Sequence, residues 1–281
     1  MPFKIHSLIS FWLLLASASR LLGEFDHSHI LWDQVLKAHV RDALVDYRAL
    51  SENSVLLDRY LKQLNSVSRS TVDSWSREHQ MAFWINAYNA LTVRVILDYY
   101  PIKTWTFKGL VAPRNSIIQI PGVWDKLTWT VAGESLTIGH IEHGILRPDF
   151  REPRIHFVIV CASIGCPDLR AEAYTYDRLN EQMDEQTRLY VSNQNKGVKL
   201  DFEKKEVSVT KLFKWFTEDF VVDAADRVTV RNKSNDGRIA LKFISHYLNE
   251  GPTRALLQSK DTDFGYLSYD WSLNEIFPED G

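Results

Sequence analysis

The chain has 281 residues, of which 33 are basic and 36 acidic, and its formal net charge is −3. This balance, without any block of basic residues, gives no reason to expect a nucleic-acid partner or an anionic membrane surface. The length is enough for one sizeable hydrophobic core, and no repeat, low-complexity segment or long linker divides it.

Residues 1–23 have the pattern of an export signal. Lys4 precedes the apolar run Leu8–Leu15, and the small residues 16–18 follow as a cleavage motif. The run is too short to span a bilayer comfortably, and no later segment resembles a membrane helix. We therefore expect residues 24–281 to form a single globular domain that is periplasmic or secreted and has no membrane span. An uncleaved anchor is the alternative.

Hydrophobic periodicity predicts a helix-rich first half. The pattern over residues 29–50 is mixed, with a helical phase at its start. Helices are predicted at residues 55–64 and 74–100, and the second ends before Pro101, which restricts the residue ahead of it. Residues 102–129 are rich in Pro, Gly and Trp and are expected to be irregular.

The second half mixes short strands and helices without a strict βαβ order. A strand at residues 129–131 is expected to turn at Gly133 into a helix over residues 135–146, with Ser135 as its N-cap. The remaining predictions are strands at 155–161 and 207–209, helices at 177–191, 212–216 and 235–248, and an aromatic tail at 266–273 that packs onto the body. This mixture favours an α+β fold with helices around a small central sheet.

Residues 154–167, RIHFVIVCASIGCP, contain both cysteines of the chain. The apolar run predicts a buried strand that delivers Cys161 into a loop of small residues. A thiol at the mouth of a core strand, where a substrate can approach, is a candidate nucleophile. Two other interpretations stay open. A free cysteine is usually a buried small hydrophobe, and an oxidising compartment favours a disulfide between Cys161 and Cys166.

Two asparagines interrupt the otherwise apolar helix at residues 83–97. Asn86 and Asn89 share one face of it at i, i+3. Each hydrogen-bonding group that a buried amide leaves unpaired costs about 1–3 kcal/mol. The pair is predicted either to tie down a neighbouring loop or to support the site by orienting a catalytic histidine or binding substrate.

Glu142 is a second polar residue at an apolar position. On a helical wheel it falls near 40°, in the middle of the apolar arc of its predicted helix. A buried carboxylate must be paired or shifted in pKa. A structural ion pair with Arg147, Arg151 or Arg154 is therefore the alternative to a catalytic role.

A thiol nucleophile needs a nearby base or cation to lower its pKa from about 8.5. His143 lies just off the apolar arc, on an element that leads into the cysteine segment. Strand alternation turns His156 to the opposite face, as a satisfied core histidine. The residues therefore predict Cys161 as nucleophile and His143 as base, oriented by Glu142 or by Asn86.

The loop after Cys161 is expected to complete this site. Ser163 and Cys166 lie next to the thiol and are predicted as supporting residues. Backbone N–H groups of residues 162–165 are candidates for stabilising an oxyanion.

Zinc binding is a weaker interpretation. His140 is an alternative histidine for Cys161, and together with His143 and Glu142 it has suitable donor atoms. However, His140 and Glu142 diverge by about 160° on the wheel. The chain has no glycine-rich phosphate loop either, so neither a metal nor a cofactor is expected.

Four motifs occur in an order that resembles the domain-of-unknown-function 547 family. They are FWINAYNALT, IEHGILRP, HFVIVCASIGCPDLR and YDWSLN, and the resemblance runs from about residue 74 to residue 274. It implies an exported bacterial protein whose biochemical role is undefined. It also implies that Cys161 matches a cysteine often kept among relatives, whereas the position of Cys166 varies.

The family is distantly similar to papain-like and transglutaminase-like cysteine hydrolases, although His143 here precedes Cys161 in the chain. The leading hypothesis is accordingly a cysteine hydrolase or transferase acting on an amide, isopeptide or thioester bond of a peptide or small molecule. The alternative is a non-catalytic envelope module that binds peptide or glycan through tryptophans of residues 105–129. A redox role for the two cysteines is a third option.

Overall fold

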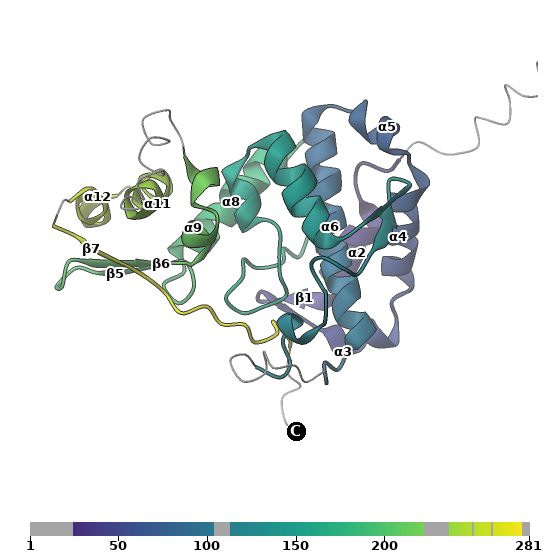
Figure 1. The fold of residues 1–281 in the computed structure, drawn as a ribbon, viewed down its shortest axis with the longest axis horizontal. Helices are drawn as coiled ribbons and strands as arrows, with labels where there is room; N and C mark the ends of the chain where they lie inside the picture. Colours follow the sequence, from purple (N-terminus) through teal and green to yellow (C-terminus); the bar gives the residue numbers. More distant parts are fainter. Residues whose placement is uncertain (1–24, 104–112, 222–235, 249, 260, 277–281) are drawn as a thin grey trace, which may run out of the picture.

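The computed structural model describes residues 25–103, 113–221, 236–248, 250–259 and 261–276 (Figure 1). The expected export signal and Trp105 lie outside these residues. Among the helices of the described segments, none has both the length and the apolar character that crossing a bilayer requires. A body of helices lies at one end of the molecule and a three-stranded sheet at the other, which is an α+β arrangement.

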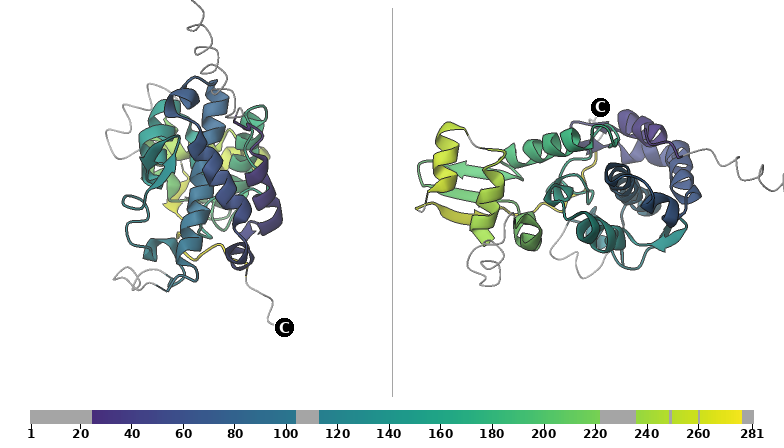
Figure 2. Two further views of the ribbon diagram at one scale, coloured as in Figure 1. Left: turned by 90° about the vertical axis from the view of Figure 1, so that its right-hand side faces the viewer. Right: turned by 90° about the horizontal axis from the view of Figure 1, so that it is seen from above.

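Helix α6 (Arg77–Tyr99) lies at the centre of the helical body. Its N-cap Ser76 accepts a hydrogen bond from the His79 N–H, and the helix ends ahead of Pro101, as predicted. Nearly every side chain from residue 81 to residue 97 is buried. Other helices surround it, as the two further views show (Figure 2).

The elements around α6 come from both sides of it in the sequence. Before it lie α2 (Ile30–His39), β1 (Val40–Arg41), β2 (Leu44–Val45), α3 (Tyr47–Glu52), α4 (Val55–Ser66) and α5 (Arg69–Asp73). Helix α4 buries Leu57, Tyr60 and Leu64, which are the residues of one helical face. The predicted helix at residues 55–64 is therefore confirmed. The helix predicted over residues 74–100 begins slightly later, because α5 is a separate turn.

The helix predicted over residues 135–146 is wrong at its start. Residues Glu134–Leu136 form strand β4, antiparallel to β3 (Trp129–Val131). Ser135 is paired within this hairpin and is not an N-cap. Residues 132 and 133 both have positive φ, which is the geometry of a two-residue hairpin turn. The turn therefore closes a hairpin before the helix begins.

The helix itself begins at α7 (Ile138–His140). Thr137 is its N-cap, because the Thr137 side chain accepts the His140 N–H. The chain then continues as a π-helix over Ile141–Phe150. Glu142 is buried in it together with the apolar residues, as the helical wheel predicted.

The three-stranded sheet has a core of its own. Strand β6 (Glu206–Val209) pairs antiparallel with β5 (Val198–Asp201) and parallel with β7 (Asp263–Tyr266). Helices α9 (Leu212–Trp215), α11 (Asp236–Ile244) and α12 (Gly251–Gln258) pack with it around a second apolar cluster, and α8 (Leu179–Ser192) leads to it. The predicted helices and strand in this region are confirmed with shifted boundaries. The three-stranded sheet nevertheless lies at one end of the molecule and not at its centre, so that part of the fold prediction is wrong.

The segment before Cys161 is not the predicted strand. Residues Pro153–Phe157 form a 3₁₀ helix, and the chain then runs on to Cys161 outside any sheet. The Asn89 side chain of α6 makes the backbone hydrogen bonds that a neighbouring strand would otherwise make. Its amide nitrogen donates to the Val158 carbonyl at 2.9 Å, and its oxygen accepts from the Val160 N–H at 3.0 Å.

Asn86 binds a second segment in the same way. Its amide donates to the Tyr174 carbonyl at 2.7 Å and accepts from the Tyr174 N–H at 3.0 Å. Both asparagines therefore tie down neighbouring chain, which is the structural interpretation of the two. Neither side chain contacts a histidine in these bonds, so the expected orienting role of Asn86 is not supported.

We predict that replacing Asn89 by Ala destabilises the fold by about 2–4 kcal/mol, because it leaves a buried carbonyl and a buried N–H unpaired. Urea unfolding followed by circular dichroism measures the loss. The matched control is Asn65→Ala on the exposed face of α4, which should change stability by less than about 0.5 kcal/mol. Equal effects of the two substitutions would contradict the assignment.

Candidate functional site

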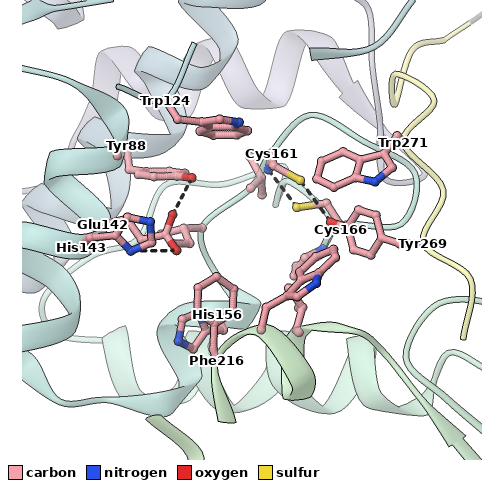
Figure 3. A pocket seen from close by; sticks show the side chains of 16 residues that line it. Tyr88, Trp124, Glu142, His143, His156, Cys161, Cys166, Phe216, Tyr269 and Trp271 are labelled. Atoms are coloured by element: carbon pink, nitrogen blue, oxygen red, sulfur yellow. Dashed lines mark hydrogen bonds and ion pairs between the residues drawn. The ribbon is translucent and has the colours of Figure 1, made fainter. Parts of the chain in front are cut away.

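A cavity of about 220 Å³ lies where the helical body, the cysteine loop and the C-terminal tail meet (Figure 3). Its walls come from segments that are far apart in the sequence. The lining side chains include Tyr88, Trp124, Glu142, His143, His156, Cys161, Cys166, Trp215, Phe216, Tyr269 and Trp271. Four of the predicted site residues are therefore brought to one cavity, with Glu142 and His143 on one wall and the two cysteines on another.

Cys161 has close polar neighbours. Its Sγ lies 3.2 Å from Ser163 Oγ and 3.1 Å from the Tyr269 hydroxyl, and its backbone N–H donates to Cys166 Sγ at 2.8 Å. Both cysteines are free thiols in this structure, and Cys161 is the more exposed of the two. The predicted supporting residues Ser163 and Cys166 thus contact the candidate nucleophile directly.

These neighbours determine which group ionises. Burial opposes ionisation of the Cys161 thiol, but hydrogen bonds from Cys166, Ser163 and Tyr269 outweigh it and lower the pKa of Cys161. Burial, followed by the hydrogen bond to Cys161 and the charge on it, raises the pKa of Cys166 well above its ordinary value. Burial and the nearby Cys161 charge raise the pKa of Tyr269 in the same way. The arrangement therefore favours one thiolate surrounded by protonated donors.

The C-terminal tail holds the loop after Cys161 in place. The tail runs from β7 back to the centre of the molecule, where Ser163 pairs with Leu273 as an isolated bridge. The Ile164 N–H donates to the Ser272 carbonyl and the Gly165 N–H to the Asp270 carbonyl, each at 2.8 Å. The predicted packing of the aromatic tail onto the body is confirmed.

This pairing also corrects the expected oxyanion site. Of the backbone N–H groups of residues 162–165, those of Ile164 and Gly165 already donate to the tail. They are therefore committed to structure. Only the Ala162 and Ser163 N–H groups stay as candidate donors from this loop.

Glu142 and His143 lie on the opposite wall, but their geometry differs from a catalytic pair. Glu142 Oε2 accepts a hydrogen bond from the Tyr88 hydroxyl at 3.1 Å. Its Oε1 lies 3.8 Å from His143 Nδ1, which is longer than a hydrogen bond. Arg147 Nη1 lies 3.0 Å from the same Nδ1. Because an arginine can only donate, Nδ1 must accept, which leaves the proton of a neutral His143 on Nε2.

Two of the three arginines predicted as partners of Glu142, Arg147 and Arg154, bind elsewhere, and no ion pair joins Arg151 to it. Arg147 Nε lies 2.6 Å from Asp219 Oδ2, and its guanidinium stacks over Phe216. Arg154 pairs with Glu152 and Asp184. Glu142 therefore lacks the arginine partner of the structural alternative in the described part of the chain.

His156 is a satisfied core histidine, as expected, although the strand that was the reason for expecting it is absent. Its Nε2 lies 2.7 Å from Asp219 Oδ2 and its ring stacks on Phe216 with centroids 4.1 Å apart. His140 is exposed and lies outside the cavity lining. In the described residues no hydrogen bond joins any histidine to Cys161, so the close Cys161–His143 contact expected of a dyad is not present.

Residues 72–191 match a family model described as "Protein of unknown function, DUF547". The chain therefore contains a DUF547 domain over these residues. No curated protein and no solved structure is significantly similar to it. The expected likeness to papain-like and transglutaminase-like enzymes therefore stays a prediction.

The DUF547 match contains only part of the cavity wall. Cys161, Cys166, Glu142 and His143 lie inside it. The aromatic residues at positions 215, 216, 269 and 271 follow it in the sequence. The aromatic side of the site is therefore supplied by the C-terminal part of this chain.

Sequence reasoning missed several residues of this site. The tail motif YDWSLN indicated packing but gave no sign that Tyr269 reaches the thiol. Tyr88 lies between the two asparagines on α6, where its aromatic ring looks like ordinary core. Asp219, which binds both Arg147 and His156, follows a short helix and had no signal in its spacing.

The described residues contain no cluster of three His, Cys, Asp or Glu side chains arranged to hold a metal ion. The redox role of the two cysteines has no test among these contacts and stays a prediction.

Gly165 has no room for a side chain, because an added Cβ would lie 2.8 Å from the Asp270 backbone nitrogen. We predict that Gly165→Ala displaces the tail and speeds amide exchange of residues 163–166 by about tenfold or more, measured by hydrogen exchange and mass spectrometry. The matched control is Gly265→Ala on β7, where the nearest atom is at an ordinary 3.5 Å. Unchanged exchange in Gly165→Ala would show that the tail does not hold the loop.

Proposed function

We propose that this protein is a cysteine-dependent acyl hydrolase or transferase that acts on an amide, isopeptide or thioester bond. One observation carries the proposal: the Cys161 thiol lies on the wall of a cavity with three protonated neighbours that favour its thiolate form. A thiolate is the reactive form of cysteine, and a cavity gives an acyl group access to it.

The same contacts explain how the thiol is activated without a histidine beside it. In a cysteine–histidine pair the imidazole takes the thiol proton. Here the thiolate is stabilised by hydrogen bonds from Ser163, Cys166 and Tyr269. The thiolate attacks the acyl carbonyl carbon, and the carbonyl oxygen becomes an oxyanion near the backbone N–H groups of Ala162 and Ser163.

Glu142 is the group that we assign to proton transfer. It lies across the cavity, and Tyr88 binds only one of its oxygens. The breaking bond leaves its electron pair on the leaving nitrogen or sulfur, which takes a proton from a water molecule held by the Glu142 carboxylate. The hydroxide formed from that water then attacks the Cys161 thioester and releases the acid and the thiolate. An amine in place of the hydroxide gives transfer.

His143 is a donor on this wall and not the base that the sequence suggested. To act as base through Nε2, it would need its other proton on Nδ1, where it would point at the Arg147 guanidinium. The neutral Nε2–H form avoids that clash and can donate a hydrogen bond to bound substrate. Replacing His143 should therefore weaken activity less than replacing Cys161.

A binding module remains the second candidate, because aromatic rings dominate the cavity mouth. Trp215 is 44% exposed, and its ring lies 4.9 Å from that of Tyr269 and 6.0 Å from that of Trp271. Such exposed rings can stack on a peptide or a glycan. The sequence predicted this role for tryptophans of residues 105–129. Of these, Trp124 lines the cavity, and Trp105 lies outside the described residues.

We predict that p-nitrophenyl acetate acetylates Cys161 in a burst of p-nitrophenolate, and that Cys161→Ser lowers the burst rate by about 10³-fold or more. Peptide mapping by mass spectrometry locates the acetyl group. Circular dichroism checks that the Ser variant is folded. An acetyl group found equally in the Ser variant, or a wild-type protein that is never acetylated at Cys161, would reject the enzyme and favour the module.

A further inference from the structure

Glu142 is unusual in its environment. Its side chain is 10% exposed, and the cavity around it is formed mainly by apolar and aromatic side chains. A buried carboxylate normally has a cationic partner, because burying it unpaired is costly. In the described residues, however, its only polar side-chain contacts are with the Tyr88 hydroxyl and with His143.

The Arg147 guanidinium beside this wall already has partners. Arg147 binds Asp219 and donates to His143 Nδ1, and Asp219 also holds His156. These bonds keep the Arg147 guanidinium directed toward Asp219 and Phe216, and no N–H group of the described residues lies within hydrogen-bond distance of Glu142 Oε1. The wall therefore presents a carboxylate oxygen that a ligand can bind.

Aromatic rings surround the space between Glu142 and Cys161. Trp124 and Phe216 lie on two sides of it, and Tyr269 and Trp271 lie beyond the two cysteines (Figure 3). The Tyr269 and Trp271 rings are 4.6 Å apart and form one continuous aromatic surface with Trp215. The faces of such rings attract cations, and Trp is the strongest of them.

We infer that the cavity binds a primary alkyl ammonium group between Glu142 and the aromatic rings, so that the bond attacked by Cys161 is the amide of a primary alkyl amine. This inference rests on the proposed function, and it selects amides and isopeptides over thioesters. An anionic ligand would face Glu142 and the thiolate, and a neutral one would leave the Glu142 carboxylate unpaired.

The proton balance follows from this assignment. When the C–N bond breaks, the leaving nitrogen takes a proton from the water held by Glu142 and becomes a neutral amine. The hydroxide left behind attacks the Cys161 thioester, the released acid gives its proton to the amine, and the resulting ammonium pairs with the Glu142 carboxylate. In the transfer direction the incoming ammonium gives one proton to the hydroxide, its free electron pair attacks the Cys161 thioester, and the proton that nitrogen loses as the amide forms passes through the Glu142 carboxylate to water while the Cys161 thiolate leaves.

Charge-matched thiol reagents test the inference without a known substrate. The three reagents are 2-aminoethyl, methyl and 2-sulfonatoethyl methanethiosulfonate, which are cationic, neutral and anionic. Each transfers its thioalkyl group to a thiolate with loss of methanesulfinate. Rates at Cys161 are divided by the rates with glutathione, and Cys161→Ser measures any background reaction at Cys166.

We expect the cationic reagent to modify Cys161 about tenfold or more faster than the neutral one after this normalisation, and the anionic reagent to be the slowest. Glu142→Gln should bring the cationic rate close to the neutral rate, and Trp271→Leu should lower the preference partly. Glu218→Gln removes the same charge from an exposed residue and should leave the preference unchanged.

The outcomes separate the two proposals. Reaction with all three reagents at similar normalised rates, or a preference that survives Glu142→Gln, would overturn the ammonium site and leave the nucleophile standing. A Cys161 that reacts with none of them would overturn the proposed enzyme itself. If Glu142→Gln fails to fold, competition supplies the test: n-butylammonium should slow modification by the neutral reagent, and n-butanol should not. Equal effects of the two would contradict the inference.

Discussion

The hydrogen bonds of Asn89 hold the cysteine segment where a strand partner would otherwise be needed. Residues 158–160 form a turn and a bend outside any sheet, and the Asn89 amide binds both the Val158 carbonyl and the Val160 N–H. This is possible because α6 is buried on all sides and carries the amide into the core. Since an unpaired backbone group in that position is costly, the amide fixes where the chain enters the Cys161 loop.

The rest of the site is formed by several segments, none of which would form it alone. The tail pairs with the loop at Ser163 and brings Tyr269 to the thiol, and Gly165 allows the close approach. The π-helix brings Glu142 to the other wall. Asp219 affects Glu142 indirectly. Because Asp219 binds Arg147, Glu142 has no guanidinium partner among the described residues.

Local sequence patterns predicted the helices well. The apolar helix before Pro101 and the amphipathic α4 follow from periodicity, because their burial is set by neighbours in the same helix. The strand predicted at residues 155–161 is wrong for a physical reason. Its backbone binds the Asn89 side chain of α6 and not a second strand, and no local sequence pattern indicates such a partner. The hairpin at Gly133 was missed because the turn was expected to open a helix.

The sequence identified the candidate residues more readily than the contacts between them. A buried carboxylate and a cysteine among small residues are visible anomalies in the sequence, and the structure brings both to one cavity. The residues that bind them lie more than 50 positions away in the sequence: Tyr88 binds Glu142, and Tyr269 binds Cys161. The role first given to His143 changes for the same reason, because a single contact with Arg147 determines its tautomer.

The pKa of the Cys161 thiol is the most direct test of the central claim that its neighbours stabilise the thiolate. The rate of iodoacetamide alkylation against pH gives it, with Cys161→Ser to subtract any reaction at Cys166. We expect an apparent pKa below the ordinary value of about 8.5, which rises in Tyr269→Phe and stays unchanged in the exposed control Tyr176→Phe. Because the thiolate is the reacting form, the rise moves the rate profile to higher pH. An apparent pKa at or above the ordinary value, or one that Tyr269→Phe leaves unchanged, would contradict it.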